Sequence, residues 1–339
     1  MKQALEKINS EQNLKWPAFF SAINKELDQV EENLTKKLPA KSKLLKEVLT
    51  HIFLSGGKRL RPALSLLMAK ATKGINNKHI VLSELTELIH TASLIHDDII
   101  DSAKLRRGNQ TVNNLWNDRI SVISGDFLFG QASVKLGELE NTEIVKVYAN
   151  VLSDLCDGEI EQFTLLFDIS ITLEKYIEKS ISKTASLFAA CCKSAAILNN
   201  CNLDTIEKAN NFGLNFGIAF QIVDDILDFT SNAKEIGKEV SSDLKQGIIT
   251  APTILALNSS DERAKQIKYL LETRFANKES DFDTAIRLIF ELGGCDKAKS
   301  LAISYSDKAI NSLDFISDLK LKASLVNITE SVIGKIIQS

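Results

Sequence analysis

Residues 82–101, LSELTELIHTASLIHDDIID, repeat apolar residues at spacings of three and four and end with three aspartates in five positions. This spacing predicts an amphipathic helix. Side chains three or four residues apart share one face of a helix. One such face carries, from its acidic end, Asp101, Asp97, Ser93, His90 and Thr86. Like charges one turn apart destabilise a helix, so the pattern indicates a cation that offsets them.

A second stretch, residues 211–229, repeats this plan as NFGLNFGIAFQIVDDILDF. One face of the predicted helix carries Asp228, Asp224, Gln221, Gly217 and Gly213. Two helices with one design suit opposite walls of a single cavity. Carboxylate oxygens favour Mg²⁺, which commonly joins one or two carboxylates to substrate phosphates. A single acidic motif would equally suit a solvated helix end, whereas two copies favour a metal site.

The fold class follows from the scarcity of turn residues. The 339 residues include only 15 glycines and 4 prolines, and helical periodicity recurs at 44–54 and 61–72. We therefore expect an all-α, single-domain bundle of long helices over residues 1–339. Within it, residues 1–20 would be a loose N-terminal segment and residues 231–247 the longest internal loop.

Composition excludes several classes of protein. The net charge of −3 and the sequence pI near 5.9 are unlike the basic footprint of a nucleic-acid-binding protein. No apolar run reaches the roughly 18 residues that a membrane span requires, and the first residues lack a signal-peptide core. We expect a cytoplasmic protein without an integral membrane segment, with membrane contact at most peripheral. The five cysteines have no paired CxxC spacing and predict packing rather than chemistry.

Basic residues accompany the acidic ones. Residues 55–62, SGGKRLRP, place two glycines before a positive cluster at the start of a predicted helix, where Lys58 and Arg61 would bind phosphate. Arg106 and Arg107 follow the first acidic motif directly. Acidic helices that hold Mg²⁺ and basic loops beside them together predict a site for two phosphorylated substrates.

These motifs resemble the trans-isoprenyl diphosphate synthases. The resemblance spans about residues 50 to 255 and rests on GGKRLRP, HTASLIHDDIIDSAKLRRG, SGDFLF, GEIEQ, EKSISKTASLF, FQIVDDILDF and GKEVSSDLKQG, in this order. It implies an all-α bundle around a deep central cavity, usually as a homodimer. It also implies a Mg²⁺-dependent prenyltransferase that joins isopentenyl diphosphate head-to-tail to an allylic diphosphate, here farnesyl or geranylgeranyl diphosphate.

The same resemblance implies a role for each matching residue. The ligands of three Mg²⁺ ions would be Asp97, Asp101 and Asp224, supported by Asp98, Asp225 and Asp228. The allylic diphosphate would be held by Arg106, Lys183 and Lys238. Isopentenyl diphosphate would be held by Gly57, Lys58, Arg61, His90 and Arg107. Thr184 and Gln221 would line the reacting centre. We further expect the 231–247 loop, with Lys238 and Lys245, to close over the diphosphates as a lid.

Product length is implied by the residues just before Asp97. Short-chain members commonly carry an aromatic residue there, whereas this chain has Ala92 and Ser93. The sequences HTASLIHDDIID and GDFLF are most similar to those of long-chain members such as solanesyl and octaprenyl diphosphate synthases. The resemblance therefore implies an all-trans product of C40–C50 for a quinone side chain. Residues deeper along this helix, or on the helices facing it, would then limit the length of the product.

Two positions depart from the family pattern. Glu239 stands where many members have proline, and Gln162 where short-chain members are acidic. Four alternatives stay open. They are a shorter-chain farnesyl or geranylgeranyl synthase, a class I terpene cyclase, a noncatalytic regulatory subunit of a heteromeric synthase, and a metal phosphohydrolase that would use His51, His90 and His96.

Overall fold

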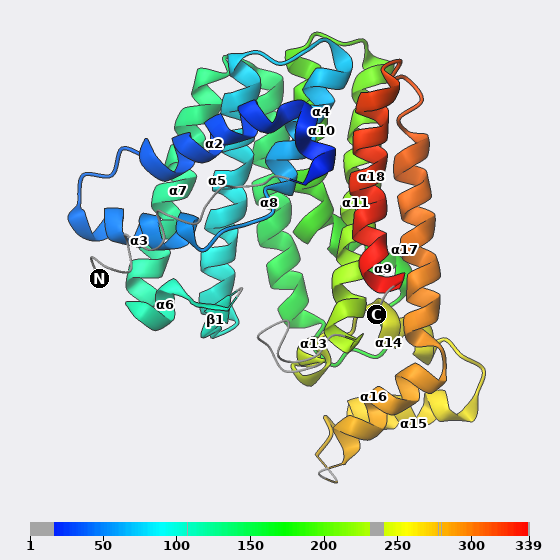
Figure 1. Ribbon diagram of the computed structural model, residues 1–339. Helices are drawn as coiled ribbons and strands as arrows, with labels where there is room; N and C mark the ends of the chain where they lie inside the picture. Colours follow the sequence, from blue (N-terminus) through cyan, green and yellow to red (C-terminus); the bar gives the residue numbers. More distant parts are fainter. Residues whose placement is uncertain (1–16, 107, 231–240, 277, 279, 338–339) are drawn as a thin grey trace.

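The computed structural model describes residues 17–106, 108–230, 241–276, 278 and 280–337, which form helices almost throughout (Figure 1). The prediction of an all-α fold is confirmed. The first half contains the 3₁₀ helix η1 (Ala18–Ile23), α2 (Asn24–Lys36), α3 (Lys43–Leu54), α4 (Leu60–Thr72), α5 (Asn77–Ile100), α6 (Val112–Leu115), α7 (Asp118–Glu138) and α8 (Thr142–Thr164). The second half contains α9 (Leu173–Ser180), the π-helix η2 (Ile181–Ala185), α10 (Ser186–Leu198), α11 (Leu203–Thr230), α13 (Ser242–Lys245), α14 (Ala251–Leu257), α15 (Glu262–Glu272), α16 (Asp281–Glu291), α17 (Gly294–Asn311) and α18 (Leu319–Ile337).

Helix α5 begins with a reciprocal cap. The Asn76 side chain accepts a hydrogen bond from the Lys78 backbone N–H at 2.9 Å, and His79 Nδ1 accepts one from the Asn76 N–H at 3.1 Å. Burial lowers the pKa of His79, which keeps the ring neutral and able to accept. This arrangement satisfies two donors that a helix start would otherwise leave unpaired. It anchors the helix that carries the first acidic motif.

Helix α10 is the centre of the bundle, because it contacts α4, α5, α8 and α11. Nearly all of its side chains are buried. The continuous helical stretch Leu173–Leu198 is long and apolar enough to pass for a membrane span by length and composition, yet 67% of its most apolar window is buried inside the protein. Packing in the core therefore accounts for its composition.

Two glycines allow α11 to approach α10 closely. A Cβ atom at Gly213 would lie 2.4 Å from the Phe188 carbonyl oxygen, and one at Gly217 would lie 2.5 Å from the Ala185 Cα. Both distances are too short for any side chain, so these positions serve helix packing. The contact brings the second acidic motif, at the end of α11, beside η2.

Non-helical elements are short. Strands β1 (Leu105–Arg106) and β2 (Asn109–Gln110) form an antiparallel pair directly after α5, too short to show a strand pattern in the sequence. At the N-terminal end, Phe20 is fully buried, so the loose segment expected over residues 1–20 does not extend that far. Of the expected loop, residues 231–240 lie outside the described residues, whereas α13 forms in its last part.

Candidate active site

The first acidic motif lies at the end of α5. Asp97 and Asp98 occupy its last turn and Asp101 is its C-cap. Carboxylates are unfavourable at this end of a helix, where the carbonyl groups already carry partial negative charge. Asp98 is buried, and its Oδ1 accepts a hydrogen bond from Arg106 Nε at 2.7 Å. Asp97 and Asp101 line a cavity.

The second acidic motif reaches the same cavity from α11, through Asp224 and Asp225. Asp225 is buried, and its carboxylate accepts hydrogen bonds from the Tyr176 hydroxyl at 2.6 Å and from Gln221 Nε2 at 2.8 Å. Burial raises the pKa of Asp225 to about 6, although both hydrogen bonds act in the opposite direction. The two hydrogen bonds thus fix the Asp225 carboxylate in place at the cavity wall.

Asp228, the last residue of this motif, supports the chain that follows it. Its carboxylate accepts hydrogen bonds from the Ser242 hydroxyl at 3.0 Å and from the backbone N–H groups of Ser242 and Asp243, each at 3.2 Å. These groups form the first turn of α13. Asp228 therefore joins the end of α11 to α13.

The cavity between the two motifs has a volume of about 200 Å³. Its charged and amide-bearing lining comprises Asp97, Asp101, Arg106, Gln162, Lys179, Lys183, Gln221, Asp224, Asp225, Asp243 and Gln246. Carboxylates from α5, α11 and α13 and cations from β1, α9 and η2 thus meet in one space, and the repeated sequence pattern predicts the meeting of the two acidic motifs.

The π-helical turn η2 presents Lys183 to this cavity and places Thr184 against the lining residue Gln221. Such turns occur frequently at functional sites. Lys183 Nζ lies 2.6 Å from Glu159 Oε1 and donates to Gln162 Oε1 at 3.2 Å. The Thr184 hydroxyl donates to Gln221 Oε1 at 2.6 Å. The Gln162 amide therefore holds the lysine without adding a charge.

The electrostatics of the cavity favour a bound cation. Burial, together with the negative charges of Glu159 and Asp101, raises the pKa of Asp97 to about 7, against the opposing effect of Lys183. Among the described residues, no three His, Cys, Asp or Glu side chains form a ready-made metal site. The oxygen donors on the two walls fit hard divalent cations whose coordination is completed by a ligand's phosphates. Within the described ranges, converging histidines therefore do not form a phosphohydrolase site.

A second cavity, of about 70 Å³, shares Leu94 and Arg106 with the first. It is bordered by Gly56, His90 and Arg106, so the structure brings two of the predicted phosphate-binding residues together. Gly57, Lys58 and Arg61 precede or begin α4 without lining either cavity. The Arg61 guanidinium carbon lies 4.1 Å from the centre of the Phe188 ring, and Lys58 is exposed.

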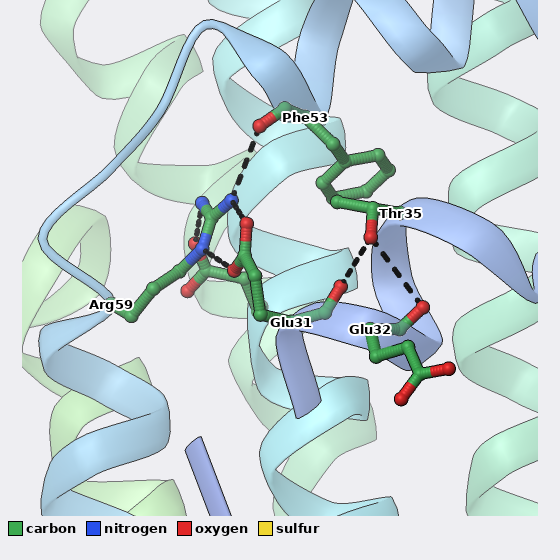
Figure 2. A network of polar contacts seen from close by, with 6 residues as sticks. Glu31, Glu32, Thr35, Phe53 and Arg59 are labelled. Carbon is green, nitrogen blue, oxygen red and sulfur yellow. Dashed lines mark hydrogen bonds and ion pairs between the residues drawn. The ribbon is translucent and has the colours of Figure 1, made fainter. Parts of the chain in front are cut away.

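Arg59, which the sequence analysis did not single out, is the buried centre of an ion-pair network (Figure 2). It has a positive φ of 49° and binds Glu31 of α2 through Nε at 2.6 Å and Nη2 at 2.9 Å. Its Nη1 binds Glu87 of α5 at 2.9 Å. Arg59 thus ties two helices to the turn that carries Lys58. Spacing alone gave no signal, because its partners are 28 residues away on either side.

Lys335 is a further basic residue that the sequence analysis did not select. It belongs to the last helix, α18. Burial and the nearby Lys58 lower the pKa of Lys335 to about 8, while Asp224 acts in the opposite direction. The C-terminal helix therefore brings a cation close to both a predicted phosphate ligand and the second acidic motif.

The predicted chain-length positions differ from each other. Ala92 is fully buried, whereas Ser93 is half-buried. Deeper along α5, Ile89 and Thr86 are also fully buried, and the Thr86 hydroxyl hydrogen-bonds to the Tyr148 hydroxyl at 2.5 Å. The face therefore carries small side chains next to Asp97, and a buried pair of hydroxyl groups, Thr86 and Tyr148, lies about three turns below it. Arg107 and Lys238 lie outside the described residues.

Three comparisons with known proteins agree with this geometry. A family model described as Polyprenyl synthetase matches residues 42–289. A protein named prenyl transferase from Cyanophora paradoxa is 40% identical, covering 93% of this chain and 97% of that protein. Solanesyl diphosphate synthase 1, chloroplastic, from Arabidopsis thaliana is 39% identical, covering 94% of this chain and 79% of that protein.

Solved structures show the same fold. A decaprenyl diphosphate synthase from Rhodobacter capsulatus superimposes with a TM-score of 0.87 at 30% identity, covering 94% of this chain and 98% of that one. A polyprenyl synthase from Caulobacter crescentus CB15, solved with calcium and isoprenyl diphosphate, gives a TM-score of 0.87 at 29% identity, covering 93% and 96%. The chain therefore belongs to the polyprenyl synthetase family, as a prenyltransferase of the long-chain type.

Proposed function

We propose that this prenyltransferase condenses isopentenyl diphosphate head-to-tail onto farnesyl or geranylgeranyl diphosphate, repeatedly, to give an all-trans C40–C50 polyprenyl diphosphate for a quinone side chain. The observation that carries the proposal is the single cavity lined by Asp97, Asp101 and Asp224 together with Arg106 and Lys183. A terpene cyclase would need no second diphosphate pocket, and a regulatory subunit would not need both acidic motifs.

The allylic diphosphate is expected to lie between the acidic walls. Asp97, Asp101 and Asp224 would hold three Mg²⁺ ions, which would supply positive charge against the negative charge that grows on the departing diphosphate. Arg106, Lys183 and Lys238 would bind the same oxygens as fixed cations. Their charges are in place before the bond breaks, so no reorganisation is needed during the reaction.

The second substrate, isopentenyl diphosphate, would bind through Gly57, Lys58, Arg61, His90 and Arg107. When the allylic C–O bond breaks, the electron pair leaves with the diphosphate and an allylic cation remains. The isopentenyl double bond then attacks this cation, and the proton lost from the new product goes to the released diphosphate. Thr184 and Gln221, hydrogen-bonded to each other, would line the reacting centre and keep water from the cation.

The growing tail is expected to run along α5 away from Asp97. The small side chains of Ala92 and Ser93 leave the first part of this path open, and the path then meets Thr86 and Tyr148. The solanesyl and decaprenyl names of the relatives support a long product.

An aromatic side chain at the mouth of this path should shorten the product. In Ser93→Phe, the ring would stand one turn, about 5.4 Å, below Asp97, where it would block the tail. We expect products of four isoprene units or fewer from a geranyl primer, measured by chromatography of the dephosphorylated products. Ser93→Ala, the matched control, should keep the wild-type length. Unchanged product length in Ser93→Phe would contradict a tail path along this face.

The proposed activity is tested by incubating the purified protein with Mg²⁺, radiolabelled isopentenyl diphosphate and farnesyl or geranylgeranyl diphosphate. A ladder of products ending near eight to ten isoprene units is expected. A ladder that stops at three or four units would replace the long-chain product by a short-chain one. Absence of incorporation with every primer would favour a regulatory subunit.

The family resemblance and the surface support a homodimer of single-domain subunits, which we propose to act in the cytoplasm. Helices α7 and α8 expose apolar side chains, including Ile123, Val134 and Ile160. Burial of these side chains against a second copy would remove them from water. A molar mass near twice the 37.5 kDa of the chain, measured by light scattering, is expected. A monomeric mass at micromolar concentration would contradict the dimer.

A further inference from the structure

Lys179 is a buried lysine that the chemistry described above does not use. It lies on α9, one helical turn before Lys183, and its side chain is only 6% exposed. It lines the same cavity as Asp97 and Asp224. A lysine is almost never this buried unless its charge has a partner. The burial of Lys179 therefore needs an explanation.

The acidic groups around Lys179 only partly offset the cost of burying its charge, because the net effect on its pKa is a decrease. Burial lowers the pKa of Lys179; Asp225, Asp243 and Glu161 raise it, while Lys183 lowers it. Asp225 raises the pKa of Lys179 more than the other two acids do, but its carboxylate already accepts hydrogen bonds from Tyr176 and Gln221. Over the described part of the chain, the Lys179 side chain forms no hydrogen bond or ion pair.

Lys183 provides an internal comparison. Its ammonium is held by Glu159 at 2.6 Å and by Gln162 at 3.2 Å, so its charge is compensated by the protein. Two ammonium groups one turn apart on one wall repel each other. A buried charge without a partner is costly. A polyvalent anion bound between the two lysines would reverse both penalties.

We propose that Lys179 binds the diphosphate of the allylic substrate together with Lys183, and stabilises that diphosphate as it departs. This inference rests on the proposed function. When the allylic C–O bond breaks, its electron pair passes to the diphosphate oxygen, and Lys179 remains protonated throughout. An ammonium group already buried beside that oxygen stabilises the growing negative charge strongly, because little water screens it.

The test uses inorganic diphosphate with Mg²⁺ as the probe, on the full chain, by isothermal titration calorimetry. In Lys179→Met, we expect its Kd to rise about 10- to 100-fold, as for loss of a hydrogen bond between charged groups. Lys179→Arg should retain most of the affinity. The matched control is Lys175→Met, one turn earlier on the same helix, where the lysine is paired with Glu161 and Glu178 at the surface. Its Kd should equal that of the wild type.

Two further measurements separate ligand binding from a structural role. A diphosphate ligand predicts that Lys179→Met lowers kcat, leaves the KM for isopentenyl diphosphate unchanged, and leaves the Tm of the ligand-free protein unchanged or higher. A merely structural partner of Asp225 predicts a lower Tm with normal diphosphate affinity, and that result would overturn the proposal. If the wild type forms no prenyl product but Lys179→Met still weakens diphosphate binding, the proposed function fails while this site stands.

Discussion

Replacing Asp97 with asparagine is expected to lower kcat for isopentenyl diphosphate incorporation by roughly 10³-fold, the loss typical when one preorganised electrostatic group is removed. Asp97 is the cavity carboxylate on which burial and the neighbouring acids act together, so its charge is the one that a bound cation most relieves. Asn keeps the size of the side chain and removes only that charge. The measurement is steady-state incorporation at saturating Mg²⁺ with both substrates.

The opposite wall supplies a second variant and a control. Asp224→Asn should give a comparable decrease in kcat. The decrease in the double variant should be much smaller than the product of the two single fold decreases, because both groups act on one ligand. Asp204→Asn makes the same change at the far end of α11, where Asp204 pairs with Lys208 at the surface, and should leave kcat unchanged. Asp97→Asn activity within fivefold of the wild type would contradict the proposed metal role.

The thermal stability of Asp97→Asn should not fall with its activity. In the ligand-free protein, the charge of Asp97 is opposed by burial and by Glu159. Asp97→Asn should therefore leave the Tm unchanged or raise it, as is common when a functional charge is removed. A large fall in Tm would mean that the activity loss reflects misfolding.

The second large effect is expected from Arg59→Met, which should lower the free energy of unfolding by about 3–5 kcal/mol. The change leaves Glu31 and Glu87, which bind the two sides of the guanidinium, without a partner in or near the core. Denaturant unfolding followed by circular dichroism measures the loss. We also expect a higher KM for isopentenyl diphosphate, because Arg59 holds the turn that carries Lys58.

A triple variant tests whether the unpaired carboxylates cause this loss. Glu31→Gln and Glu87→Gln, combined with Arg59→Met, should recover much of the stability, since removing a whole buried ion-pair network is far less costly than removing one partner. A loss below about 1 kcal/mol in Arg59→Met alone would place this network in the class of weak surface pairs.

Much of the site was predictable because one helix face is a local property. Periods of three and four residues place Asp97 and Asp101 on one side of a helix whatever surrounds them, and the repetition of the pattern in α11 predicted a shared cavity. The few glycines and prolines likewise predicted an all-α fold. The sequence places Gly213 on the same face, and the structure shows the close approach of α11 to α10 at this glycine.

Other features could not be predicted, because they depend on residues far apart in the chain. The spacing places Asp98 off the face that carries Asp97 and Asp101, but it does not show that tertiary contacts pair Asp98 with Arg106. Similarly, Asp225 is engaged by Tyr176, 49 residues earlier. The sequence likewise did not predict the burial of Lys179, because the residues of its helix have the composition of an ordinary charged surface segment.

The sequence by itself determined which residues share a helical face, because backbone geometry sets that periodicity within a few residues. It thereby determined the all-α class and the two acidic faces. Only the tertiary structure decided which of those charges already have a partner and which remain open to a ligand. Desolvation and pairing depend on how distant helices pack, and that packing leaves Lys179 facing the cavity while Arg59 is enclosed by two carboxylates.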